Sequence, residues 1–208
     1  MTRDYTNAFQ CDYSAVAVEE LPSGGVPRWY YPGALQTGGR DGLLVLISPK
    51  QGNCWLGVFG FGDVVGSGSA LLSTPDVRTL LVVARGCAYF VNTHDPLDWQ
   101  GIRTPYPVTD VRAIPESNMI LVADYTKIAA FRGREQVWIT GRISFDGIRI
   151  MSVGPKFIEG EAWDPTISIP PTFRIDLQTG SCEGGADTDI VSRRTTKRNW
   201  LQKFWKRV

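Results

Sequence analysis

Residues 108–143 read VTDVRAIPESNMILVADYTKIAAFRGREQVWITGRI, and this stretch decides the expected fold. Two apolar runs, at 119–123 and 128–131, are separated by a short polar segment, and Gly133 precedes a third run at 137–139. Short segments rich in β-branched and aromatic residues, divided by turn residues, are typical of β-strands. The stretch therefore predicts a small unit of short antiparallel strands.

The same pattern recurs along the chain at an interval of about 40 residues, as β-propeller blades do. Each copy has a proline followed by an acid, then an apolar run, and later a tryptophan. The two clearest copies are Pro75-Asp76 with 80–82 and Trp99, then Pro115-Glu116 with 120–122 and Trp138. The apolar runs at 43–45, 148–153 and 173–177 fit the pattern more loosely.

This order of acid, apolar run, turn and aromatic-rich return resembles the blades of the WD40/PQQ-like β-propeller group over residues 40–180. No G-H…W-D signature stands in any repeat. The resemblance implies an all-β fold of about four blades, either β-propeller-like or a partial propeller of short antiparallel strands. An irregular β-sandwich or barrel with evenly spaced strands is the alternative. A partial propeller that a partner chain closes is a further one.

Three local patterns give sharper expectations. The run at 15–18 predicts an edge strand, and the continuous apolar run at 43–47 predicts a strand buried on both faces. Asp146-Gly147 stands between the apolar segments 142–145 and 148–153, which predicts a hairpin.

The charge of the chain is unevenly placed. Seven of the 22 Lys and Arg residues lie at 193–208, where no Asp or Glu stands, so the rest carries 15 basic against 21 acidic residues. We therefore expect an all-β domain at 1–180, a polar linker at 181–192 and a basic helix at 193–208.

The segment 193–208 has the pattern of an amphipathic helix. Its apolar residues fall within an arc of about 140° on a helical wheel, and its basic residues near the end fall outside it. The apolar residues are Trp200, Leu201, Phe204, Trp205 and Val208, and the basic ones are Lys203, Lys206 and Arg207. Such a helix suits docking on its own acidic domain, a groove of a partner protein or an anionic membrane surface. Nucleic acid ranks last because the acidic domain would repel it.

Carboxylates cluster beside a tryptophan at 159–164, where Glu159, Glu161 and Asp164 stand close together. Paired carboxylates perform glycoside hydrolysis when they face each other across a sugar ring. Solvated surface acids are the commoner explanation. The single histidine, His94, could join Cys87 in catalysis, but their spacing matches no nucleophile signature.

Five aromatic residues before residue 100 are Trp29, Tyr30, Tyr31, Trp55 and Trp99. They predict either packing between sheets or an exposed platform for a ligand. We expect no cofactor, since no phosphate-binding glycine motif is complete, and no metal, since one histidine and scattered cysteines do not form a zinc set. The start of the chain lacks the pattern of a signal peptide, so we expect a cytoplasmic protein with free thiols.

Together these patterns favour a non-catalytic protein-interaction or scaffolding module over an enzyme. A glycosidase-like hydrolase and a peripheral membrane protein are the alternatives. Protein is the first partner expected, an anionic membrane the second, and an assembly of several copies is left open.

Overall fold

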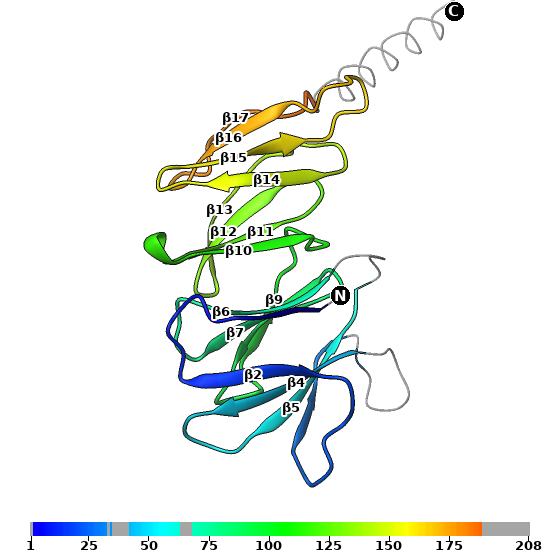
Figure 1. Cartoon of the computed structure of the whole chain (residues 1–208), viewed down its shortest axis with the longest axis vertical. Coiled ribbons are helices and arrows are strands. Elements are labelled where there is room, and N and C mark those ends of the chain that lie inside the picture. The colour runs from blue at the N-terminus through cyan, green and yellow to red at the C-terminus, as the bar shows by residue number, and fades with distance from the viewer. Residues whose placement is uncertain (1, 33, 35–41, 63–67, 189–208) are drawn as a thin grey trace, which may run out of the picture. The chain divides into compact units, whose positions relative to one another are not determined.

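The chain forms four small sheets of mostly antiparallel strands (Figure 1). The computed structural model describes residues 2–32, 34, 42–62 and 68–188. The first sheet has the order β2-β4-β5-β3, with β2 (Tyr13–Val18), β3 (Arg28–Tyr30), β4 (Gly42–Pro49) and β5 (Trp55–Gly60). The second has the order β1-β6-β7-β8-β9, with β1 (Thr2–Thr6), β6 (Ser69–Ser73), β7 (Thr79–Ala84), β8 (Cys87–Asn92) and β9 (Trp99–Gly101).

The third and fourth sheets follow the chain without a change of order. The third contains β10 (Asp110–Ile114), the 3-10 turn η1 (Pro115–Ser117), β11 (Met119–Ala123), β12 (Ile128–Arg132) and β13 (Glu135–Ile139). The fourth contains β14 (Ile148–Val153), β15 (Phe157–Ala162), β16 (Thr172–Asp176) and β17 (Cys182–Gly184). Four-stranded meanders that follow one another along the chain are the architecture of propeller blades. The expected all-β, propeller-like fold is confirmed.

The chain divides into two compact units. The first comprises residues 1–124 and 128–139 and so holds the first three sheets; the second comprises 125–127 and 140–208 and holds the fourth. Within the described ranges, no helix has the length and apolar character needed to cross a membrane.

The second sheet is packed on both of its faces inside the first unit. Leu80 and Val82 of β7 join a core with Val45 and Ile47 of the first sheet. The alternate residues of β7, Leu81 and Val83, join a separate core with residues of the third sheet such as Ile120 and Phe131. Because successive side chains of a strand point to opposite faces, a strand packed on both sides must be apolar throughout. This explains the continuous apolar run in β7.

Two tight turns contain residues in the left-handed backbone conformation. Arg85 and Gly86 join β7 to β8 with φ of 45° and 93°, the left-handed conformation of a tight hairpin turn. Asn118, which ends η1, has φ of 56°, a conformation that asparagine tolerates better than most residues. The edge strand expected near 15–18 is confirmed as β2, which lies at the border of its sheet.

Three local expectations are corrected. β4 is not buried on both faces. Val45 and Ile47 are fully buried, whereas Leu44 and Leu46, which alternate with them, are half-buried, because only one face of the first sheet packs against the second. Residues 142–145 form no hairpin with β14, because Ile143 N donates to Thr126 O and Phe145 N to Trp163 O. Residues 182–184, expected in a linker, form β17, which pairs with β16.

The described part of the chain ends at residue 188, so the predicted helix at 193–208 lies outside it. All four cysteines lie within the described part, and none forms a disulfide, which confirms the expected free thiols.

Candidate functional site

An open groove of about 650 Å³ lies beside β9 in the first unit. The residues that define this aromatic groove include Tyr89, Trp99, Gly101, Arg103, Tyr106 and Phe131. They come from β8, β9, the segment after β9, and β12 of the third sheet. Its volume falls in the usual range for a ligand site.

Trp99 presents an indole ring to the groove from a rigid aromatic support. Its ring meets that of Tyr31 edge-on, with centroids 5.8 Å apart at 89°, and that of Tyr89 at 6.4 Å and 60°. Tyr31 in turn stacks on Phe59 at 4.3 Å. The supporting rings are buried, but Trp99 is 38% exposed. Aromatic contacts of this geometry hold a ring in place, so Trp99 is an exposed apolar surface in a fixed orientation.

Hydrogen bonds fix the two tyrosines of that support. Tyr89 Oη donates to Pro32 O at 2.9 Å, and Tyr31 Oη donates to Pro96 O at 3.0 Å. Burial raises the pKa of both hydroxyls, and the charge of Asp95 adds to the effect at Tyr31. Both tyrosines are therefore neutral near pH 7, where their hydroxyl protons hold the residues that precede β4 and β9.

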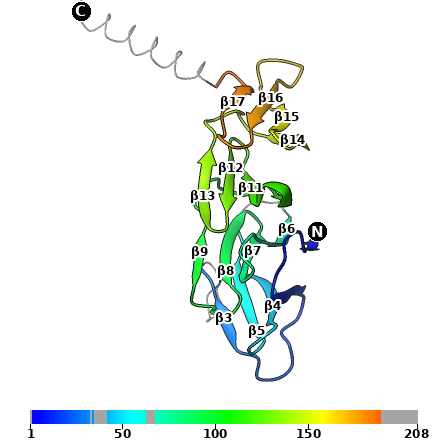
Figure 2. The same cartoon turned by 90° about the vertical axis from the view of Figure 1, so that its left-hand side faces the viewer.

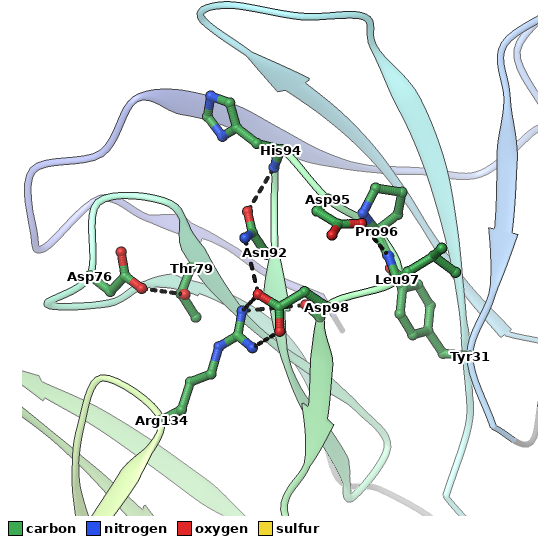
Figure 3. A network of polar contacts seen from close by, with 10 residues as sticks. All are labelled: Tyr31, Asp76, Thr79, Asn92, His94, Asp95, Pro96, Leu97, Asp98 and Arg134. Carbon is green, nitrogen blue, oxygen red and sulfur yellow. Dashed lines mark hydrogen bonds and ion pairs between the residues drawn. The ribbon is translucent and has the colours of Figure 1, made fainter.

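A polar network anchors the chain at the point where β9 begins (Figure 3). Arg134, in the turn between β12 and β13, donates through both guanidinium Nη atoms to the carboxylate of Asp98. Asn92 Nδ2 donates to the same carboxylate at 3.1 Å. The pKa of Asp98 is lowered mainly by the Arg134 hydrogen bond and then by that of Asn92. This ion pair ties the second sheet to the third at the residue before Trp99.

The segment between β8 and β9 is held by its own side chains as well. His94 N donates to Asn92 Oδ1 at 3.0 Å, and Leu97 N donates to Asp95 Oδ1 at 3.0 Å (Figure 3). Side chains that hydrogen-bond the backbone two residues away are typical of tight, ordered turns. The approach to Trp99 is therefore pre-formed.

The floor and rim of the groove differ in polarity. Ile102 and Phe131 are buried, whereas Tyr106 is 49% exposed. Arg103 is exposed, and among the lining residues it is the one charged side chain. Among its described residues the groove offers apolar contact, polar edges and the exposed cation of Arg103. The described residues that line it include no Asp, Glu, His or Lys.

The carboxylates at 159–164 lie in the second unit and form an ion-paired surface. Glu159 and Glu161 are two apart on β15, so they lie on one face of the strand. Glu159 Oε1 is 3.7 Å from Arg174 Nε, and Glu161 Oε2 is 3.7 Å from Arg149 Nη1. Both pairs are cross-strand neighbours in an antiparallel sheet.

Asp164 has a structural contact of its own. Its Oδ1 accepts hydrogen bonds from Thr166 N at 2.8 Å and from Thr166 Oγ1 at 2.7 Å. These bonds lower the pKa of Asp164, which is opposite to the shift that a general acid requires. The hydrolase reading of Glu159, Glu161 and Asp164 stays an untested prediction, and the geometry described here does not favour it.

The side chain of His94 also makes local contacts with neighbouring polar side chains. His94 Nε2 lies 3.5 Å from Asp12 Oδ2, and its Nδ1 lies 3.2 Å from Thr93 Oγ1. Cys87 begins β8 and Asn92 ends it, so His94 and Cys87 are at opposite ends of that strand. The two side chains are therefore too far apart to act as a catalytic pair. Among the described residues, no cluster of three or more His, Cys, Asp or Glu side chains is arranged to hold a metal ion.

The aromatic residues singled out in the sequence divide between the two expected arrangements. Tyr31 and Trp55 are buried in the core of the first two sheets, and Trp99 alone of the five lines the groove. Sequence reasoning missed Tyr89, Arg103 and Tyr106. A tyrosine in an apolar strand and a Thr-Pro-Tyr-Pro segment are signals of packing and of a loop, and nothing local connects them with Trp99.

Comparison with known proteins leaves the family open. No family model matches the sequence, and no curated protein matches it significantly. The fold is similar to the crystal structure of the N-terminal domain of Nup159, with a TM-score of 0.40, 10% identity, and coverage of 87% of this chain and 53% of that chain. A chain of the S. cerevisiae complex of a Dbp5 variant with Nup159 and a Gle1 variant gives a TM-score of 0.40, 10% identity, and coverage of 88% and 52%. The chain thus spans about half the length of the solved chains that it matches.

Proposed function

We propose that the protein is a non-catalytic interaction module that binds a segment of a partner protein in the aromatic groove. The observation that carries this proposal is Trp99, a residue that is 38% exposed and lines the groove while buried aromatic rings support it. Tryptophan and tyrosine are the residues most enriched among the dominant contacts of protein interfaces. A rigid support reduces the conformational entropy that binding would cost.

The remaining surface of the groove suits a peptide better than a reacting small molecule. Tyr106 and the amides of Gln100 and Gln136 line it together with Arg103. These groups supply apolar contact, hydrogen bonds and charge attraction, which are the means by which peptides are recognised. Within the described part of the chain, the residues that line the groove include no Asp, Glu, His or Lys.

The test is a selection of displayed random peptides on the wild-type protein and on Trp99→Ala. We expect Trp99→Ala to weaken the selected peptides by about 30-fold or more, the effect of removing a dominant interface residue. Trp163→Ala is the matched control, because Trp163 is 48% exposed but lies on the second unit. Equal binding by wild type and Trp99→Ala would contradict the proposal.

The basic segment 193–208 is a second proposed contact, on the evidence of its sequence. We propose that Trp200, Leu201, Phe204 and Trp205 form its apolar face, with Lys203, Lys206 and Arg207 beside it, and that it docks on its own domain or on a partner. Truncation after Ser192 separates these cases. A lower melting temperature would indicate docking on the domain. Loss of binding to a partner or to anionic vesicles, with an unchanged melting temperature, would indicate an outward contact.

A further inference from the structure

We infer that the partner segment binds as an extended strand that pairs with the free edge of β9 and carries an acidic residue beside Arg103. This inference rests on the proposed function and specifies the chemistry of the partner. It is drawn from the hydrogen-bond phase of β9, from the absence of charged residues and proline in that strand, and from the charge of the aromatic groove.

The hydrogen-bond phase shows which backbone groups of β9 are turned outward. Asn92 N donates to Asp98 O, and Ile102 N donates to Ala88 O, both at 2.9 Å. In an antiparallel pair, alternate residues exchange hydrogen bonds with the neighbouring strand, so positions 98, 100 and 102 face β8. The N–H and C=O groups of Trp99 and Gly101 therefore point away from β8.

β9 is the last strand of its sheet, so these outward groups lie at an edge. The order β1-β6-β7-β8-β9 places β8 on one side of β9, and Figure 2 shows β9 beside β8 at the border of the sheet. Trp99, Gln100 and Gly101 all line the aromatic groove, so an added strand at this edge would occupy the groove. A segment in this position could form hydrogen bonds with the backbone of both Trp99 and Gly101.

β9 has only three residues, Trp99–Gly101, so an added strand would pair with a short edge. Its sequence, Trp-Gln-Gly, has no lysine, no proline and no charged residue. Gly101 also leaves the backbone uncovered, since a Cβ there would have only ordinary contacts, with the Trp99 ring at 3.8 Å and Ala88 O at 4.0 Å. An incoming backbone can thus approach Gly101 closely.

The charges at the groove favour an acidic partner. Arg103 is exposed, and none of the described residues that line the groove is a carboxylate. Asp98, the carboxylate nearest in sequence, is already paired with Arg134. An Asp or Glu of the partner segment would therefore meet an unopposed cation, while an apolar residue of the same segment would rest against Trp99 and Tyr106.

Selection and backbone methylation test the inference together. Displayed random decapeptides are selected on the full-length protein, and the consensus peptide is synthesised in two forms, methylated on one or the other alternate set of backbone amides. We expect one form to lose about ten-fold or more in affinity and the other to bind nearly as the parent, because only one set faces β9. We also expect Asp or Glu in the consensus, and its replacement by Lys or Arg when selection is repeated on Arg103→Glu.

The other possible outcomes separate a failure of the strand-pairing inference from a failure of the proposed function. If both methylated forms bind as the parent while Trp99→Ala abolishes binding, the strand-pairing inference fails and the proposed function stands. If no peptide depends on Trp99, both fail. If the protein is a dimer that Gly101→Pro dissociates and no peptide binds, the edge pairs with a second copy and the inference is overturned. Arg149→Glu, at an exposed arginine of the second unit, is the charge control.

Discussion

The second sheet, in strands β6 to β9, and the fourth sheet share a four-stranded antiparallel meander but differ in their surfaces. In the second sheet, β7 is buried at every position, and its two faces join two separate cores. In the fourth, β15 alternates: Ile158, Gly160 and Ala162 are buried, whereas Glu159 is exposed and Glu161 is half-buried. A sheet packed on both faces needs apolar residues throughout, whereas a sheet with one charged face presents that face to solvent.

The difference also determines where a binding surface can form. The aromatic core of the second sheet extends to its edge, where Trp99 continues the cluster of Tyr31 and Tyr89 into the groove. On the exposed face of the fourth sheet, by contrast, opposite charges are paired with each other. Arg174 pairs with Glu159, and its guanidinium lies 3.7 Å from the ring centroid of Phe157. A surface whose charges are already paired has little to offer a partner.

The largest expected effect is that of Phe90→Ala in β8. Phe90 is fully buried, and its ring lies 5.5 Å from that of Phe131 across the core between the second and third sheets. Removing a buried phenylalanine side chain costs about 3–5 kcal/mol of the free energy of unfolding. Arg174→Ala, on the charged face of the fourth sheet, is expected to cost about 1 kcal/mol or less. Urea unfolding of both variants measures their free energies of unfolding. Equal losses in the two variants would contradict the expected difference between the buried sheet and the charged face.

An intermediate effect is expected from Gly160→Ala, on the buried face of β15. A Cβ at this position would lie 2.4 Å from Arg149 O and 2.4 Å from the Phe173 ring, so the neighbouring strands must move apart. We expect a loss of about 1–3 kcal/mol in the free energy of unfolding, as in other overpacked sites. Gly141→Ala in the same unit is the control, since a Cβ there meets nothing within 4 Å. A melting temperature of Gly160→Ala equal to that of the control would show that the fourth sheet is loosely packed.

The smallest effect concerns the ion pairs of the two sheets. Because Arg134 lowers the pKa of Asp98 below its ordinary 3.8, the pair stabilises the fold above that pH and the contribution is lost as pH falls through the lowered pKa. Asp98→Asn should cost about 0.5–1 kcal/mol at pH 7, since the carboxylate is half exposed. Glu159→Gln should cost less, because its pair is longer and more exposed.

Unfolding of these two variants across pH provides the measurement. The difference between wild type and Asp98→Asn is expected to shrink in acid. A difference that persists unchanged at pH 2 would show that the amide disturbs packing rather than charge.

Much of the fold follows from local patterns. The repeat near 40 residues, the strands around 80, 120 and 128, and the Arg85-Gly86 turn were all predictable, because side-chain alternation and turn conformation depend on neighbours in the chain. The hairpin expected at Asp146-Gly147 was wrong for a reason outside that range: Gly147 N donates to Tyr125 O, more than 20 residues earlier. The D-G pair is a turn signal, but distant backbone groups decide what the flanking segments pair with.

The sequence by itself determined that this protein is built of short β-strands separated by turns, since strand and turn preferences are local. Only the tertiary structure decided which faces are covered and where Trp99, Arg103 and Tyr106 meet. The groove exists because β8, β9 and β12 come together in space and Arg134 reaches Asp98 from 36 residues away. Such contacts depend on how whole sheets pack, and no window of neighbouring residues contains that information.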